Sequence, residues 1–85
     1  MAYRVELKPS AASQLRKLDR GIQKRIFAKF DQLRDNPRPN GVQKLAGEDD
    51  LYRVRVGDFR IVYTIFDDQL LVLVLVIGDR KDVYR

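Results

Sequence analysis

The fold is decided by residues 51–77, which read LYRVRVGDFRIVYTIFDDQLLVLVLVI. Runs of β-branched and aromatic residues are separated here by Gly57-Asp58 and by Asp67-Asp68-Gln69, which are residues typical of turns. The stretch therefore predicts three strands, at residues 51–56, 59–66 and 70–77. Short hairpin turns place the middle strand between the other two.

The last of these strands is apolar at every position, which is typical of a strand that is covered on both faces. It must then lie inside the sheet, so a short alternating strand at residues 3–7 is expected to pair along its other edge. If the chain reverses direction at each successive element, the N-terminal strand and the last strand run in opposite directions. The expected pairing is therefore antiparallel.

Two helices are predicted between these regions. Ser10 is a candidate N-cap for the first. The second helix runs from about residue 20 to residue 35, and its core stripe recurs at helical spacing at Ile22, Ile26, Phe30 and Leu33. Asn36-Pro37 ends it, because a residue before proline avoids the α region. The expected fold class is α+β, a four-stranded antiparallel sheet with an N-terminal helical hairpin packed on one face, in a single domain spanning residues 1–85.

Composition limits the chemistry that this chain can perform. It has no cysteine and no histidine, so thiolate metal ligands and the usual acid–base side chain are missing. Asp49-Asp50 and Asp67-Asp68 fall at predicted turns, where aspartate is favoured for its backbone hydrogen bonds. We therefore expect no cofactor and no metal. The absence of a signal-peptide stretch and of a long apolar run predicts a cytoplasmic protein without a membrane partner.

The chain is basic, with 17 lysines and arginines against 12 acidic residues and a formal net charge of +5. Such a balance favours a polyanionic partner, although it also simply keeps a small protein soluble. Because side chains alternate along a strand, Arg53 and Arg55 project from one face, and Arg60 approaches them from the next strand. The cluster indicates an anion-binding site; the alternative is a charged edge that prevents aggregation.

The C-terminal residues 78–85 follow the apolar strand directly and are rich in charge. Arg80 and Tyr84 are candidate functional residues at the edge of the sheet, and Lys81 is a candidate phosphate contact. The alternative is a solvated tail in which Tyr84 packs locally.

The order of elements and several motifs resemble the RelE/ParE toxin superfamily over essentially the whole chain. The motifs that carry the resemblance are Tyr3-Arg4-Val5, Leu15-Arg16-Lys17-Leu18, Lys44-Leu45 with Gly47, residues 51–63 and residues 76–84. RelE-like members of this superfamily cleave mRNA in the ribosomal A site, whereas ParE-like members poison DNA gyrase.

The resemblance implies catalytic roles for Arg60, Arg80 and Tyr84. It implies RNA-binding roles for Arg53, Arg55 and Lys81. Lysine is common in the cleaving subgroup where this chain has Arg53 and Arg55. Because arginine does not readily lose a proton, neither residue is a credible general base.

The function predicted on this basis is that of a toxin of a type II toxin–antitoxin system, a ribosome-dependent endoribonuclease that inhibits translation by metal-independent 2′-hydroxyl attack. The alternatives are a ParE-like gyrase inhibitor without chemistry, and a module that only binds RNA or an antitoxin. The expected partners are a cognate antitoxin, mRNA and the ribosome, with operator DNA bound by the complex through the antitoxin. Some of Leu71, Leu73 and Leu75, or the helix groove near Leu15 and Ile22, should offer the antitoxin an apolar surface.

Overall fold

One mixed sheet and two helices make up the part of the chain that the computed structural model describes, residues 2–45 and 51–79. The elements in chain order are β1 (Arg4–Leu7), α1 (Pro9–Arg16), α2 (Arg20–Asp35), β2 (Gln43–Lys44), β3 (Leu51–Val56), β4 (Phe59–Phe66), the 3₁₀ turn η1 (Asp67–Gln69) and β5 (Leu71–Asp79). The α+β class, the second helix and the three long strands are as the sequence predicts.

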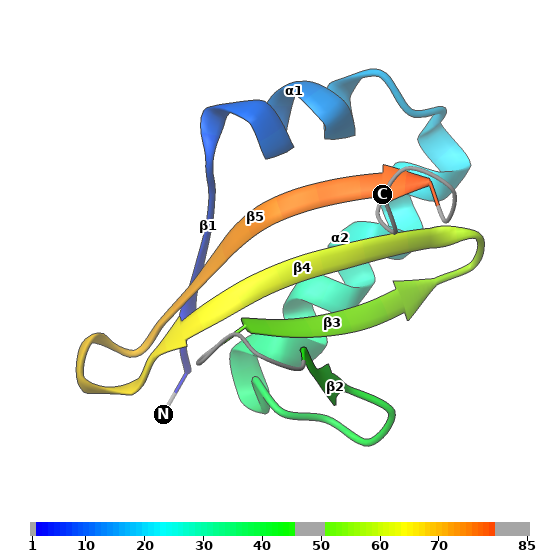
Figure 1. Cartoon of the computed structure of the whole chain (residues 1–85). Helices are drawn as coiled ribbons and strands as arrows, with labels where there is room; N and C mark the ends of the chain where they lie inside the picture. The colour runs from blue at the N-terminus through cyan, green and yellow to red at the C-terminus, as the bar shows by residue number, and fades with distance from the viewer. Residues whose placement is uncertain (1, 46–50, 80–85) are drawn as a thin grey trace.

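The sheet has five strands in the order β1-β5-β4-β3-β2 (Figure 1). As expected, β4 lies between its hairpin neighbours and β1 pairs with β5. The prediction of a four-stranded, fully antiparallel sheet is wrong in two respects. The two-residue strand β2 adds a fifth member beside β3. Strand β1 runs parallel to β5, with Arg4 opposite Leu71 and Leu7 opposite Val74.

The parallel pairing follows from the unequal lengths of the two helices. With eight residues, α1 is only about 12 Å long and cannot return the chain along the sheet. The longer α2 makes the return, and the Tyr3 N–H donates to the Arg34 carbonyl at 2.9 Å, so α2 ends where β1 begins. The hairpins of β3, β4 and β5 then reverse the chain twice, which leaves β5 running in the direction of β1.

Local signals set the ends of the helices. The first helix begins with Pro9 after Lys8, which makes no side-chain cap, so the expectation that Ser10 is the N-cap is wrong. Proline is favoured at this position because its missing N–H would have no helical partner there. Asp19 caps α2 by accepting a hydrogen bond from the Ile22 N–H at 3.0 Å. Among the described residues, no helix is long and apolar enough to cross a membrane.

The core lies between the helices and one face of the sheet (Figure 1). The predicted stripe of α2 is confirmed, with Ile26, Phe30 and Leu33 at most 2% exposed. The sheet contributes alternate residues of each strand: Tyr52, Val54, Val56, Ile61, Tyr63, Ile65, Val72, Val74 and Ile77. In β5, the register shift beside Val62 and Tyr63 leaves Leu75 without a direct partner and resets the alternation.

Neither of the two described helices lies on the opposite face of the sheet (Figure 1). On this open face Leu71 is 8% exposed, whereas Val76 is 42% exposed and Phe66 is 38% exposed. The expectation that the last strand is covered on both faces is therefore wrong at Val76. The expectation of coverage is met on the other face of β5, where the helices pack. Two helices can cover only one face of the sheet.

A polar cluster ties together the ends of the sheet where β1 and β5 begin. Arg38 donates to both carboxylate oxygens of Asp67, at 2.9 and 3.2 Å, and Tyr3 donates its hydroxyl to Asp67 at 2.7 Å. Arg38 also lies over the ring of Tyr52, 5.3 Å from its centroid. The Arg38 guanidinium and the Tyr3 hydroxyl lower the pKa of the Asp67 carboxyl.

We expect Phe30→Ala to lower the free energy of unfolding by about 3–5 kcal/mol, because it leaves a cavity between α2 and the sheet. Phe27 is the matched control: it lies on the same helix, touches the Phe30 ring edge-on and is 50% exposed. Phe27→Ala should cost less than about 1 kcal/mol. Urea unfolding of the three proteins measures the difference, and equal losses would contradict this account of the core.

Asp67→Asn should make stability less dependent on acid pH. Because the pKa of Asp67 is lower in the folded chain than in the unfolded one, its contribution is complete above the ordinary carboxyl range. It is lost as the pH falls through the lowered value. The unfolding free energies of the wild type and Asp67→Asn should therefore converge as the pH is lowered from 7. Parallel pH profiles of the two proteins would contradict this account of the Asp67 cluster.

Candidate functional site

Three arginines project from the open face at the β3–β4 hairpin. Arg55 lies directly opposite Arg60 in the antiparallel register, and Arg53 lies two residues earlier on the same face. The residues that alternate with them, Val54 and Ile61, are 4% and 0% exposed on the helix side. Burial of the apolar alternates therefore aims the arginines at the open face, as the sequence predicts.

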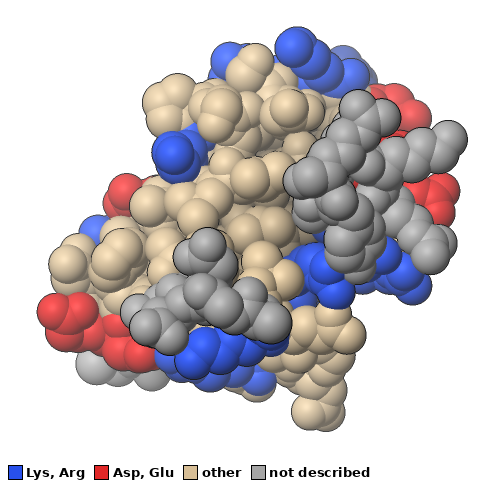
Figure 2. Space-filling view, in the orientation of Figure 1, with Lys and Arg blue, Asp and Glu red and all other residues tan. Residues whose placement is uncertain are grey.

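The arginines surround a hollow, which we call the arginine hollow, with a volume of about 270 Å³. Its lining residues are Gly41, Gln43, Arg53, Val54, Arg55 and Arg60. No acidic residue is among them, and Figure 2 shows lysine and arginine gathered over the β3 side of this face. The middle of the same face is mostly uncharged (Figure 2). The hollow therefore concentrates positive charge where an anion can enter from solvent.

The arginines of the hollow differ in how firmly they are held. Arg60 is only 7% exposed, so its side chain is fixed by packing, whereas Arg55 is exposed at the rim. Arg53 is half-buried and donates to the Gln43 side-chain oxygen. A guanidinium presents several N–H donors in a planar fork that suits phosphate oxygens. The hollow thus offers a buried donor, Arg60, and an exposed one, Arg55.

Gln43 and Gly41 are parts of the hollow that sequence reasoning missed. They belong to the polar segment after α2, which reads as a loop with no periodicity. Gln43 is placed by the short pairing of β2 with β3, where it lies opposite Arg53. The only sequence signal is a polar residue next to Lys44, which is too weak to single it out.

The predicted residues Arg80, Lys81 and Tyr84 lie outside the described residues, so their roles stay predictions. The described chain ends with Asp79 paired to Phe59 and Gly78 paired to Arg60. The described part of β5 therefore ends at the same end of the sheet as the arginine hollow. The shift at Leu75 puts Gly78 on the open face, opposite Arg60.

The Gly57-Asp58 turn holds Arg55 and Arg60 opposite each other. Gly57 has φ of +58°, a left-handed conformation that suits glycine at the first position of a two-residue hairpin turn. A Cβ at this position would lie 3.0 Å from Nη1 of Arg25, which packs against the turn from α2. The backbone conformation therefore favours glycine here, and a larger residue would also displace the end of the Arg25 side chain.

The site can bind a phosphate group, but its described side chains offer no proton acceptor of the usual kind. Arginine stays protonated, so Arg53, Arg55 and Arg60 stabilise negative charge rather than remove protons. Within residues 2–45 and 51–79, no three acidic, histidine or cysteine side chains come together as metal ligands. The chemistry that fits is stabilisation of a phosphate, or of the more negatively charged state formed when a nucleophile attacks it.

The described chain is thus a small sheet with two helices on one face and arginines on the other. Residues 5–84 match the family described as ParE toxin of type II toxin-antitoxin system, parDE. The chain belongs to this family, and the predicted membership of the RelE/ParE superfamily is confirmed.

The chain is also similar to proteins that are named RelE or RelE-like. A protein of Escherichia coli named as RelE-like is 36% identical to this chain, over 100% of this chain and 93% of that protein. The mRNA interferase toxin RelE of Escherichia coli K12 is 28% identical over 99% of this chain and 92% of RelE. The crystal structure of the archaeal RelE–RelB complex from Pyrococcus horikoshii has a chain of 30% identity and TM-score 0.83, covering 94% of this chain and 97% of that one.

Gly57→Ala should lower the free energy of unfolding by about 1–2 kcal/mol, because alanine resists the left-handed conformation. Gly21 is the matched control within α2, since a Cβ there would meet only Asp19 Oδ1 at 3.8 Å. Gly21→Ala should be neutral or stabilise by up to about 1 kcal/mol. Thermal unfolding checks the opposite signs. A Gly57→Ala variant as stable as the wild type would show that the turn does not constrain the hairpin.

Proposed function

We propose that this protein is a toxin that cleaves messenger RNA on the ribosome without a metal ion. The observation that carries the proposal is the arginine hollow, which has three guanidinium groups and no acidic residue among its described lining residues. The mRNA interferase activity that the name of RelE states for a relative supports it. In this proposal residues 1–85 act as one toxin domain in the cytoplasm, where ribosomes are found.

The reaction that suits these residues is attack of a 2′-hydroxyl on the adjacent phosphate. The 2′-oxygen bonds to phosphorus and its proton passes to a base, while the bond to the 5′-oxygen breaks and that oxygen takes up a proton. Arg60 and Arg80 stabilise the charge that develops on the phosphate, and Arg53, Arg55 and Lys81 hold the flanking backbone. Tyr84 stacks on a base or takes part in proton transfer.

The proposal includes a cognate antitoxin as a protein partner. The solved relative from Pyrococcus horikoshii is a complex of RelE with RelB. In this chain the apolar part of the open face includes Val76 and Phe66, which are 42% and 38% exposed. An antitoxin that covers this area as well as the arginine hollow would both bury apolar surface and block RNA. The proposal assigns operator binding to the antitoxin in the complex.

A gyrase inhibitor remains the second candidate because the matching family is named for ParE. The two functions are separated by inducing the toxin and measuring mRNA 5′ ends and plasmid supercoiling in the same cells. New mRNA ends inside coding regions with unchanged supercoiling support the nuclease. Altered supercoiling without new mRNA ends would instead support inhibition of gyrase.

Arg80→Ala should reduce cleavage of ribosome-bound mRNA by about 10²–10³-fold, the usual cost of losing one group that stabilises the transition state. Arg16→Ala is the control, because Arg16 is exposed on α1 and lines neither the arginine hollow nor its surroundings. Its activity should match the wild type. Full activity of Arg80→Ala would remove the proposed mechanism.

Two further measurements separate the parts of this mechanism. If the Tyr84 ring only stacks, Tyr84→Phe should keep most of the activity, and if the hydroxyl moves a proton, Tyr84→Phe should resemble Tyr84→Ala. Cleavage should persist after EDTA treatment when cobalt hexammine maintains the ribosome in place of magnesium. Loss of cleavage traced to a metal on the toxin itself would contradict the metal-independent step.

A further inference from the structure

We propose that a second phosphate-binding site lies on the helix side of β3, where Arg25 and Lys29 of α2 meet Arg55. It would hold a backbone phosphate of the same single-stranded RNA that occupies the arginine hollow. This inference rests on the proposed RNA-directed function, and it assigns a binding role to a surface of α2.

The site is a second hollow, here called the α2 hollow, with a volume of about 370 Å³. Its lining residues are Arg25, Ala28, Lys29, Gln32, Arg55, Val56 and Gly57. Three of them are cationic and none is acidic. The lining residues from α2 recur at helical spacing, so a single face of the helix supplies two of the three cations.

Two of the cations contact neighbouring groups: Arg25, which is exposed, and Lys29, which is half-buried. The guanidinium of Arg25 packs against Gly57, as the 3.0 Å approach to a Cβ at that position shows. The ammonium of Lys29 donates to the Gln32 side-chain oxygen at 2.8 Å. Within residues 2–45 and 51–79, no carboxylate forms an ion pair with Arg25, Lys29 or Arg55. By contrast, Arg34 on the same helix is paired with Asp31.

The two hollows are joined through Arg55, which lines both and is exposed. Strand β2 pairs only with Tyr52 and Arg53, so the described part of β2 stops short of Arg55 along the β3 edge. A strand of RNA can therefore pass around this edge and keep phosphates close to cations on both sides. A chain that carries one negative charge per nucleotide suits this run of cations, and each neutralised phosphate adds salt-dependent affinity.

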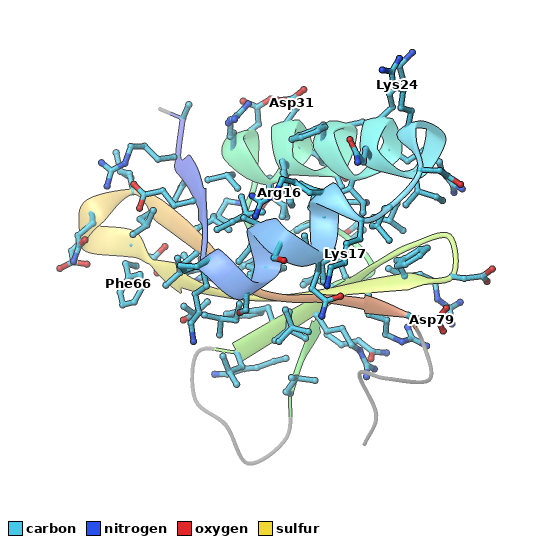
Figure 3. The ribbon with its side chains drawn as sticks, turned by 90° about the horizontal axis from the view of Figure 1, so that it is seen from above. Arg16, Lys17, Lys24, Asp31, Phe66 and Asp79 are labelled. Carbon is cyan, nitrogen blue, oxygen red and sulfur yellow. The ribbon has the colours of Figure 1, made fainter. Side chains whose placement is uncertain are left out.

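The simpler explanation is that Arg25 and Lys29 belong to an ordinary solvated helix face. Arg20 and Lys24 provide a matched test of it, because they are also four residues apart on α2, exposed and outside both hollows. Figure 3 shows Lys24 pointing away from the sheet. A diffuse electrostatic effect would depend on either pair, whereas a built site depends on Arg25 and Lys29 alone.

The first experiment measures binding of a fluorescent 2′-O-methyl single-stranded oligonucleotide, which cannot undergo 2′-hydroxyl attack, across a salt series. The double variant Arg25→Ala with Lys29→Ala should bind at least about tenfold more weakly at low salt. Its log–log salt slope should be shallower by about 0.7 for each lost phosphate contact. Arg20→Ala with Lys24→Ala, which removes the same charge, should keep the wild-type slope. Equal effects of the two doubles, or an unchanged slope in the first, would overturn the inference.

The second experiment needs no variant, so it remains decisive if a double variant folds poorly. An amine-reactive label is applied to the wild-type protein with and without the same oligonucleotide, and each lysine is read by mass spectrometry. Lys29 should be protected by RNA while Lys24 is not. Equal labelling of Lys29 in both samples would overturn the site. Neither readout involves cleavage, so a wild type that binds in this way but fails to cut mRNA would contradict only the proposed function.

Discussion

The register of the β3–β4 hairpin is the constraint on which the rest of the structure depends. Because side chains alternate along a strand, a slip of one residue would turn the arginines of β3 into the core and Tyr52 toward solvent. The two-residue turn at Gly57 prevents this slip by setting Arg55 opposite Arg60. The helices, which cover one face only, then determine which set of side chains is buried and which is presented to a ligand.

The core also supports the site through the segment after α2. Tyr63 is fully buried, and its hydroxyl donates to the Pro37 carbonyl at 2.7 Å. Burial raises the pKa of Tyr63, so the hydroxyl remains a donor throughout the physiological range. The Tyr52 ring stacks on Tyr63 and lies under Arg38. This chain of contacts anchors the segment that leads to Gln43, and so connects burial in the core to the position of an arginine on the open face.

The open face combines two kinds of surface that serve different partners. Its β3 side is cationic and suits phosphate, whereas its β4–β5 side includes the exposed apolar residues Phe66 and Val76 (Figure 2). In the proposed function, RNA contacts the first surface and the antitoxin contacts both. Placing them side by side on one sheet allows an antitoxin to compete with RNA for the arginines while it is held by apolar burial. Inhibition then needs no change in the toxin's own fold.

The sequence by itself determined the local features: the bounds of α2, the three long strands, and the shared face of Arg53, Arg55 and Arg60. These depend on helical or strand periodicity and on turn residues, which are visible within a short window. Tertiary structure decided the parallel pairing of β1, the strand β2 beside β3, the reset of β5 at Leu75 and the approach of Arg25 to Gly57. Each of these depends on where distant segments meet, which is set by helix length and packing rather than by any local pattern.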